Sequence, residues 1–161
     1  MHSPTDMKSH LEHRTSILSA FISERKKVSR DGFNCYFDAT VITCRSLWAL
    51  LGITMSSHCE TDLKKPTATK LSFSNFANIR KNISPLVQIT PFSSDAEFDA
   101  LPERDAIIKV LAAANKCVAH FEDLLDHGVH EDELEMVAKR VLCELSHRVK
   151  IPTQPTGALI T

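Results

Sequence analysis

Apolar residues return every three or four positions along four long stretches of the chain, a spacing that places them on one face of a helix. The first stretch opens at Ser3 and Pro4, with proline at the first helical position, and runs to about Arg30. The second covers residues 33 to 51 and is expected to be the most buried helix. Its apolar line consists of Phe33, Phe37, Val41, Cys44, Trp48 and Leu51.

Two further helical stretches lie in the second half of the chain. The third runs from Pro102 to about Asp126, with apolar residues at Ile107, Leu111, Ala114, Val118, Phe121 and Leu125. The fourth opens at Glu131 with three acidic residues, which suit a helix N-terminus. Its apolar face is formed by Leu134, Val137, Val141, Leu145 and Val149. The short break between the two stretches predicts an antiparallel helical hairpin.

Glycines stand where the helical spacing stops. Asp31-Gly32 is expected to interrupt the chain between the first and second helices, Gly52 to end the second and Gly128 to end the third. Glycine favours these positions because it adopts the left-handed conformation that often follows a helix.

The region between the second and third long helices has a different pattern. From Ile53 to Leu71 the helical spacing is lost, which predicts a long surface connection. A short helix is expected over residues 74 to 81 and extended chain over 82 to 92. Ser94-x-x-Glu97 is a capping-box pattern, which predicts a short helical turn.

These patterns predict an all-α, single domain that resembles a four-helix bundle, with an irregular insertion between the second and third long helices. We expect the bundle to span residues 1–151. Residues 152–161 have no periodicity and are expected to form a flexible tail. A chain of 161 residues is long enough for one hydrophobic core, and its four glycines and single tyrosine also favour helices over strands.

Charge and cysteine content narrow the expected partners and location. With 19 basic and 20 acidic residues the formal net charge is −1, so any nucleic-acid site must be local. The five cysteines include no Cys-x-x-Cys pair, which favours a reducing compartment. The first twenty residues are too polar for a signal peptide, and no apolar run approaches the ~20 residues of a membrane span. We therefore expect a cytoplasmic protein with no membrane partner.

The polar side of the third helix carries the candidate chemistry. Lys109, Lys116, His120 and Asp123 are expected to gather there, beside the small residues Ala112, Ala113 and Ala119. An imidazole exchanges protons at neutral pH, a neighbouring carboxylate orients it, and a lysine neutralises phosphate. Solvated helix faces carry the same residue types, so an ordinary polar surface is the alternative interpretation.

The string Ala-Asn-Lys-Cys-Val-Ala-His-Phe, which ends at Phe121 and precedes the helical hairpin turn, resembles the signature region of HEPN domains. In that family an arginine upstream of a histidine forms a metal-independent ribonuclease site across a dimer interface. The resemblance implies a homodimer that binds RNA or a nucleotide through Asn115, Lys116, His120 and Asp123, with no cofactor. Catalysis would use His120 as acid and base, Lys116 as the cation and Asn115 as a positioning group.

The chain departs from the HEPN pattern where the arginine should stand, because Ala113, Ala114 and Asn115 occupy those positions. Lys116 lacks the bidentate geometry of a guanidinium and stands too close to the histidine. The resemblance therefore implies a non-catalytic or weakly catalytic RNA-binding module, and whether the chain is an enzyme stays open.

A second hypothesis belongs to a different class. The chain would be a non-enzymatic helical domain whose alanine-lined face packs against a partner or its own copy. Glu144-x-x-His147 has the spacing of a di-iron helix, but such a site needs the motif twice and only one copy is present. No metal site is predicted.

Overall fold

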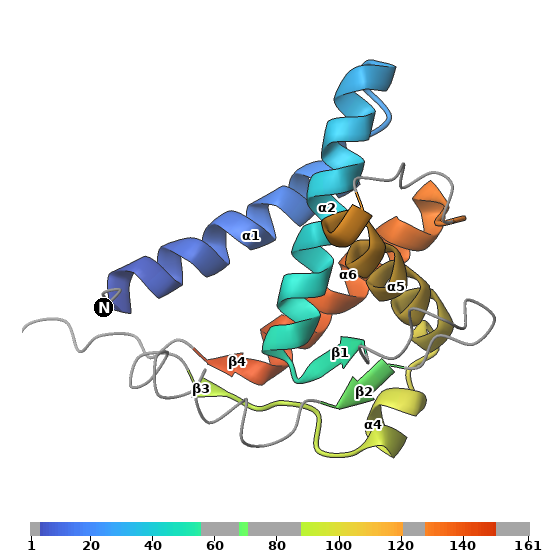
Figure 1. Ribbon diagram of the computed structural model, residues 1–161. Coiled ribbons are helices and arrows are strands. Elements are labelled where there is room, and N and C mark those ends of the chain that lie inside the picture. Colours follow the sequence, from blue (N-terminus) through green and yellow to red (C-terminus); the bar gives the residue numbers. More distant parts are fainter. Residues whose placement is uncertain (1–3, 56–67, 71–87, 121–127, 151–161) are drawn as a thin grey trace, which may run out of the picture.

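The computed structural model describes residues 4–55, 68–70, 88–120 and 128–150, and within them the side chains of 8–55, 88–115 and 128–150. This part of the chain is mostly helical, as the sequence predicts (Figure 1). The long helices are α1 (Pro4–Glu24), α2 (Arg30–Leu50), α5 (Arg104–His120) and α6 (Glu131–Arg148). Short elements complete it: α4 (Asp95–Asp99), β1 (Ile53–Met55), β2 (Ala68–Lys70), β3 (Gln88–Ile89) and β4 (Val149–Lys150).

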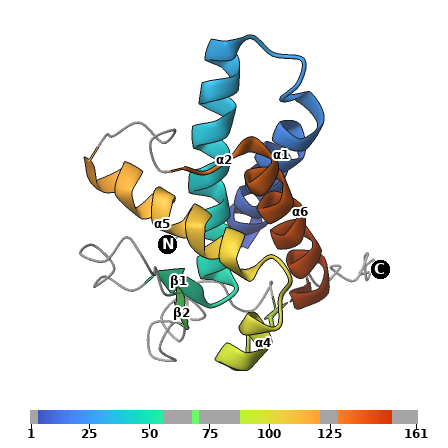
Figure 2. The same cartoon turned by 90° about the vertical axis from the view of Figure 1, so that its right-hand side faces the viewer.

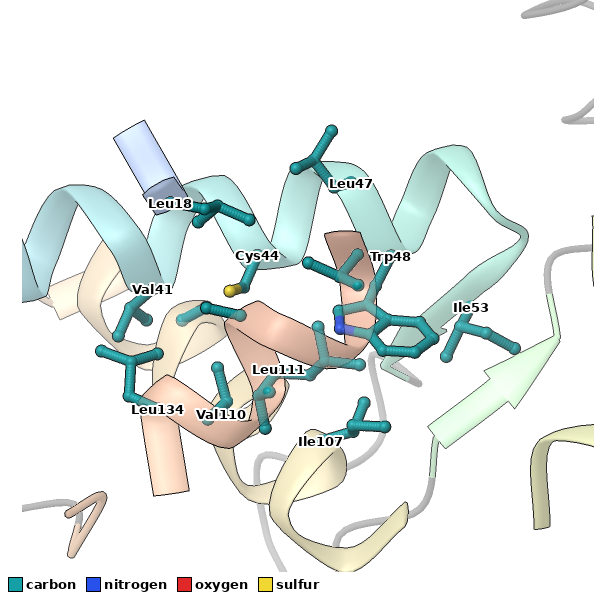
Figure 3. Packing of buried hydrophobic residues seen from close by; sticks show 14 of the residues in the cluster. Leu18, Val41, Cys44, Leu47, Trp48, Ile53, Ile107, Val110, Leu111 and Leu134 are labelled. Carbon is teal, nitrogen blue, oxygen red and sulfur yellow. The ribbon is translucent and has the colours of Figure 1, made fainter. Parts of the chain in front are cut away.

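Helix α2 forms the centre of the structure and contacts α1, α5 and α6 (Figures 1 and 2). Its predicted apolar line is buried from Phe37 to Trp48, which confirms it as a core helix. Figure 3 shows how side chains from α1, α2, α5, α6 and β1 meet in this core. The largest side chains with almost no exposed surface are Trp48, Phe21, Phe92, Leu18, Leu47, Leu51, Ile107, Leu111 and Leu134.

The break between the first two helices lies earlier than predicted. Helix α1 ends at Glu24, and α2 already begins at Arg30, so Gly32 lies in its first turn. The Oγ atom of Ser29 caps α2 by accepting a hydrogen bond from the Gly32 backbone N–H at 3.3 Å. A glycine inside a helix costs about 1 kcal/mol relative to alanine, and a serine cap contributes a similar amount. The cap therefore offsets the glycine, and the expected interruption at Asp31-Gly32 is wrong.

The end of α2 agrees with the sequence. Gly52 follows Leu51 with a φ angle of 93°, the left-handed conformation that glycine adopts most readily. The carbonyl of Leu51 accepts a hydrogen bond from the Phe92 N–H at 3.1 Å. This contact ties the segment that precedes α4 to the end of α2.

Short strands at both ends of the insertion were not predicted. Ile53–Met55 pairs antiparallel with Ala68–Lys70, in a region where the sequence predicts only a long surface connection. Strands of three residues are too short to show an alternating apolar pattern. Gln88–Ile89 pairs with Val149–Lys150, which confirms extended chain in this part of residues 82 to 92. The short helix expected at 74 to 81 lies outside the described residues.

The predicted capping pattern before α4 is present in modified form. Ser94 Oγ accepts a hydrogen bond from the Glu97 N–H at 3.2 Å. The Glu97 carboxylate, however, turns back to the N–H and hydroxyl of Ser93, at 2.7 and 2.8 Å, instead of reaching the Ser94 N–H. The Glu97 carboxylate therefore also holds Ser93, the residue just before the N-cap, in place.

Helices α5 and α6 pack antiparallel, as predicted. Glu103, just before α5, meets Arg140 in the middle of α6, and Lys109, further along α5, meets Glu133 near the start of α6. Helix α5 begins at Arg104 and not at Pro102, while residues 121–127, which include the predicted end of the helix, lie outside the described residues.

A chain of ion pairs, which we call the Arg148 network, joins α6 to the segment before α5. Arg140 donates two hydrogen bonds to Glu103, at 2.8 and 3.0 Å, and lies 3.6 Å from Glu144. Arg148 donates to Glu144 at 2.7 Å and to Glu97 at 2.5 Å. The Arg148 guanidinium also lies 3.8 Å from the centre of the Phe92 ring. The network thereby gives Glu144, only 7% of whose surface is exposed, two cationic partners.

Replacing Arg148 tests the network. Arg148→Ala leaves the buried Glu144 carboxylate with a single, longer contact, and we expect the free energy of unfolding to fall by about 3 kcal/mol. Arg104→Ala is the matched control, because Arg104 forms its ion pairs at the surface and such pairs contribute at most about 1 kcal/mol. Urea unfolding measures both, and equal losses in the two variants would contradict the role given to Arg148.

The Glu97 contacts predict an acid-dependent loss of stability. The Ser93 N–H and the Arg148 guanidinium lower the pKa of Glu97 from its ordinary value of 4.5 to about 2. A carboxylate with a lowered pKa stabilises the fold above pH 4.5, and this contribution is lost as the pH falls through the folded-state pKa. We expect stability to fall more steeply between pH 4.5 and pH 2 in the wild type than in Glu97→Gln. Parallel pH curves for the two proteins would contradict the assignment.

Candidate functional site

The predicted site on α5 is described in part. The helix continues unbroken from Arg104 to His120, so Lys116 and His120 lie one turn apart on it. The side chains of Lys116 and His120, and the whole of Asp123, lie outside the described residues, whereas the Asn115 side chain is half-buried. Their grouping into one site therefore stays a prediction.

Lys109, expected on the same polar side, forms an ion pair within the fold. Its ammonium lies 2.8 and 2.7 Å from the two carboxylate oxygens of Glu133. Burial acts to raise the pKa of Glu133, but the His130 N–H and the Lys109 charge outweigh it and hold this pKa below its ordinary value. Lys109 thus joins α5 to the start of α6 and already has a carboxylate partner.

The alanine-lined surface differs from its prediction. Ala113 is only 2% exposed, while Ala112 is half-buried. Ala114, which was predicted on the apolar line, is buried as expected. The expected open face at Ala113 is wrong because α5 packs against α2, α6 and β1 and so buries more than one line of side chains. A carboxylate introduced at Ala113 would enter the core, and such a variant does not test association.

The Glu144-x-x-His147 spacing does not form a ligand pair. Glu144 is buried and bound by Arg148, whereas His147 is exposed and its Nδ1 atom lies 3.8 Å from the Cys143 Sγ atom. Within the described residues, no three His, Cys, Asp or Glu side chains are grouped in a way that would hold a metal ion.

The side of α6 that faces away from the core contains a feature that the sequence analysis missed. Asp132, Met136, Lys139 and Cys143 follow one another at spacings of four, three and four residues, which places them on one line of the helix. We call this line the outer α6 face. It borders a shallow hollow of about 430 Å³, also lined by Glu103, Glu135 and Arg140.

Met136 is the apolar centre of the outer α6 face. Its side chain is 40% exposed, and Figure 2 shows α6 at the edge of the molecule. Two exposed charges of opposite sign flank Met136, with Asp132 four residues before it and Lys139 three residues after it. The hollow also contains Glu135, which pairs with Lys139, and Arg140, which pairs with Glu103. The sequence contained this signal as a methionine among polar residues opposite the predicted apolar line.

A second hollow of about 300 Å³ lies between α1 and α2. It is lined by Ser16, Ile17, Ala20, Cys35, Tyr36 and Ala39, none of which is charged. Ile42, 44% exposed, follows Cys35 and Ala39 along α2 at helical spacing. This hollow therefore offers apolar surface without a charge pattern that would select a partner.

The cations with described side chains on α5 and α6 already have carboxylate partners. Arg104 pairs with Asp99, Lys109 with Glu133 and Lys139 with Glu135, and Arg140 and Arg148 belong to the Arg148 network. Helix α1 is joined to α6 in the same way, because the buried Arg25 lies between Glu131 and Glu135. This pairing reduces the positive charge that these two helices present to a phosphate backbone.

Comparisons with known proteins found no matching family model, no matching curated protein and no matching solved structure. The resemblance to HEPN domains therefore stays a prediction. None of the helices in the described part of the chain combines the length and the hydropathy needed to cross a membrane.

Proposed function

We propose that this chain is a non-enzymatic helical domain that associates with a second copy of itself through the outer α6 face. The observation that carries the proposal is the exposed Met136, which lines a hollow together with the oppositely charged and exposed Asp132 and Lys139. Cys35, Cys44 and Cys143 are free thiols, which supports a reducing compartment such as the cytoplasm.

Charge order favours a second copy over an unrelated partner. A face with acidic residues at one end and basic residues at the other is complementary to itself when one copy is reversed. Asp132 and Lys139 suit this role because both are exposed, with 60% of the Lys139 side chain accessible.

The expected affinity is modest. Burying a methionine side chain contributes about 1.5–3 kcal/mol, and exposed ion pairs add at most about 1 kcal/mol each. A contact built around one helix also lies at the small end of protein interfaces. We therefore expect a dissociation constant on the order of micromolar.

Met136→Lys tests the interface. The substitution replaces the apolar centre by a cation, and we expect the dimer dissociation constant to rise at least about tenfold, which corresponds to 1.4 kcal/mol. Ile42→Lys is the matched control, because it makes the same kind of change at a similarly exposed residue on α2. Sedimentation equilibrium over a concentration series gives the constants.

The control also separates the possible outcomes. A wild-type chain that stays monomeric at high micromolar concentration would contradict self-association. A dimer that Ile42→Lys dissociates and Met136→Lys does not would place the contact at the hollow between α1 and α2, against the assignment to α6.

A second candidate function is RNA or nucleotide binding at the end of α5, the activity that the HEPN resemblance implies. The specific observation in its favour is that α5 is helical through His120, which places Lys116 and His120 on neighbouring turns. In this candidate Lys116 neutralises a phosphate, His120 moves a proton if cleavage occurs, and Asn115 and Asp123 position the groups.

Single-stranded RNA tests this candidate. If Lys116 contacts phosphate, Lys116→Ala should weaken binding measured by fluorescence anisotropy and make it less sensitive to salt. Lys27→Ala is the control, because Lys27 lies in the turn between α1 and α2 and pairs with Glu24. Cleavage measured with a chelator present should fall in His120→Ala, and equal rates in that variant and the wild type would exclude catalysis by this histidine.

A further inference from the structure

We infer that two copies pair antiparallel along α6, with the two-fold axis at Met136, so that Asp132 of one copy faces Lys139 of the other. This inference rests on the proposed self-association and adds the orientation and register of the partner. It follows from three features of the outer α6 face: its spacing, its charge order and the position of its apolar residue.

The spacing makes a helix pair possible. Asp132, Met136, Lys139 and Cys143 form a seam of the kind along which two helices pack lengthwise. The opposite side of α6 is occupied by the core, where Leu134, Val137, Val141 and Leu145 are buried. A partner helix can therefore approach α6 along the seam without disturbing the fold.

Charge order selects the antiparallel direction. In a parallel pair, residues of the same number meet, so Asp132 would face a second Asp132 and Lys139 a second Lys139. In an antiparallel pair centred on Met136, seam residues at similar distances on either side of the axis meet. Asp132 lies four residues before Met136 and Lys139 three residues after it, and both belong to the outer α6 face, so the two meet across the axis. Each end of the pair then brings opposite charges together.

The position of Met136 selects the register. With the axis at Met136, the two exposed methionines pack against each other at the centre. With the axis between Lys139 and Arg140, four cations would meet there, which is unfavourable. With the axis at Cys143, Met136 would face Lys150 at the end of the partner's β4 and would lose its apolar contact.

Cys143 gives a second distance by which the register of the pair can be checked. It is exposed and lies seven residues beyond Met136 on the same seam. In the inferred pair the two Cys143 residues lie about 21 Å apart along the helices, at 1.5 Å per residue. Two cysteines form a disulfide only when their Cα atoms lie within about 7 Å, so the native thiols at 143 cannot join in this arrangement.

Disulfide trapping of Met136→Cys in the full-length chain tests orientation and register together. The variant is oxidised at a concentration at which the wild type is dimeric, and the linked peptides are identified by mass spectrometry. Cleavage after Lys139 and Arg140 separates position 136 from Cys143, so the two crosslinks are distinguished. We expect a disulfide between the two new thiols at position 136 and none between the two Cys143 residues.

Other crosslinking patterns would overturn the inference in recognisable ways. Crosslinks at both positions indicate a parallel pair, because residues of equal number then meet along the whole seam. A crosslink at Cys143 alone indicates an axis at that residue. No crosslink while the wild-type chain sediments as a dimer means that the copies meet on another surface, and self-association itself stands. A monomeric wild type overturns the proposed function as well.

A charge exchange gives an independent readout of direction. Asp132→Lys and Lys139→Glu should each raise the dissociation constant several-fold, and the double variant should return it towards the wild-type value. In a parallel pair each single change would exchange one like-charge contact for another, so the dissociation constant would change little. That result would contradict the antiparallel arrangement.

Discussion

The burial of Glu144 against two arginines determines how the second half of this chain is arranged. A buried carboxylate is tolerated only when it is paired, and here Arg148 and Arg140 hold it from both sides along α6. The same arginines reach Glu97 and Glu103, so the segment before α5 is attached to the last helix. One side of α6 therefore packs against the core and forms this network.

The four long helices could be predicted from the sequence because their apolar residues have helical spacing. The end of α2 could be predicted because glycine readily adopts the left-handed conformation found at Gly52. The boundary between α1 and α2 was misplaced because a cap at Ser29 offsets the preference of Gly32 against helices. The strand pairs joining Ile53–Met55 to Ala68–Lys70 and Gln88–Ile89 to Val149–Lys150 depend on contacts between distant segments, which local periodicity does not contain.

The candidate site was harder to predict than the fold because exposed charges have no periodicity that separates a partner surface from solvated helix. Lys109 was grouped with the α5 site, but it pairs with Glu133 across the hairpin, and the burial of Ala113 depends on three neighbouring elements. The hollow beside the outer α6 face could not be predicted from sequence, because Glu103 and Arg140 line it from two separate segments of the chain. Its significance lies in the order of charges around an exposed methionine.

These observations connect the fold to the proposed function. The Arg148 network orients α6, and the orientation leaves Asp132, Met136, Lys139 and Cys143 on the outside. Changes of backbone amide chemical shift during serial dilution of the wild-type protein would locate the contact between copies without any substitution. Self-association through α6 predicts concentration-dependent shifts concentrated at residues 132 to 143. Shifts confined to α1 and α2 or to the end of α5, with residues 132 to 143 unchanged, would contradict it.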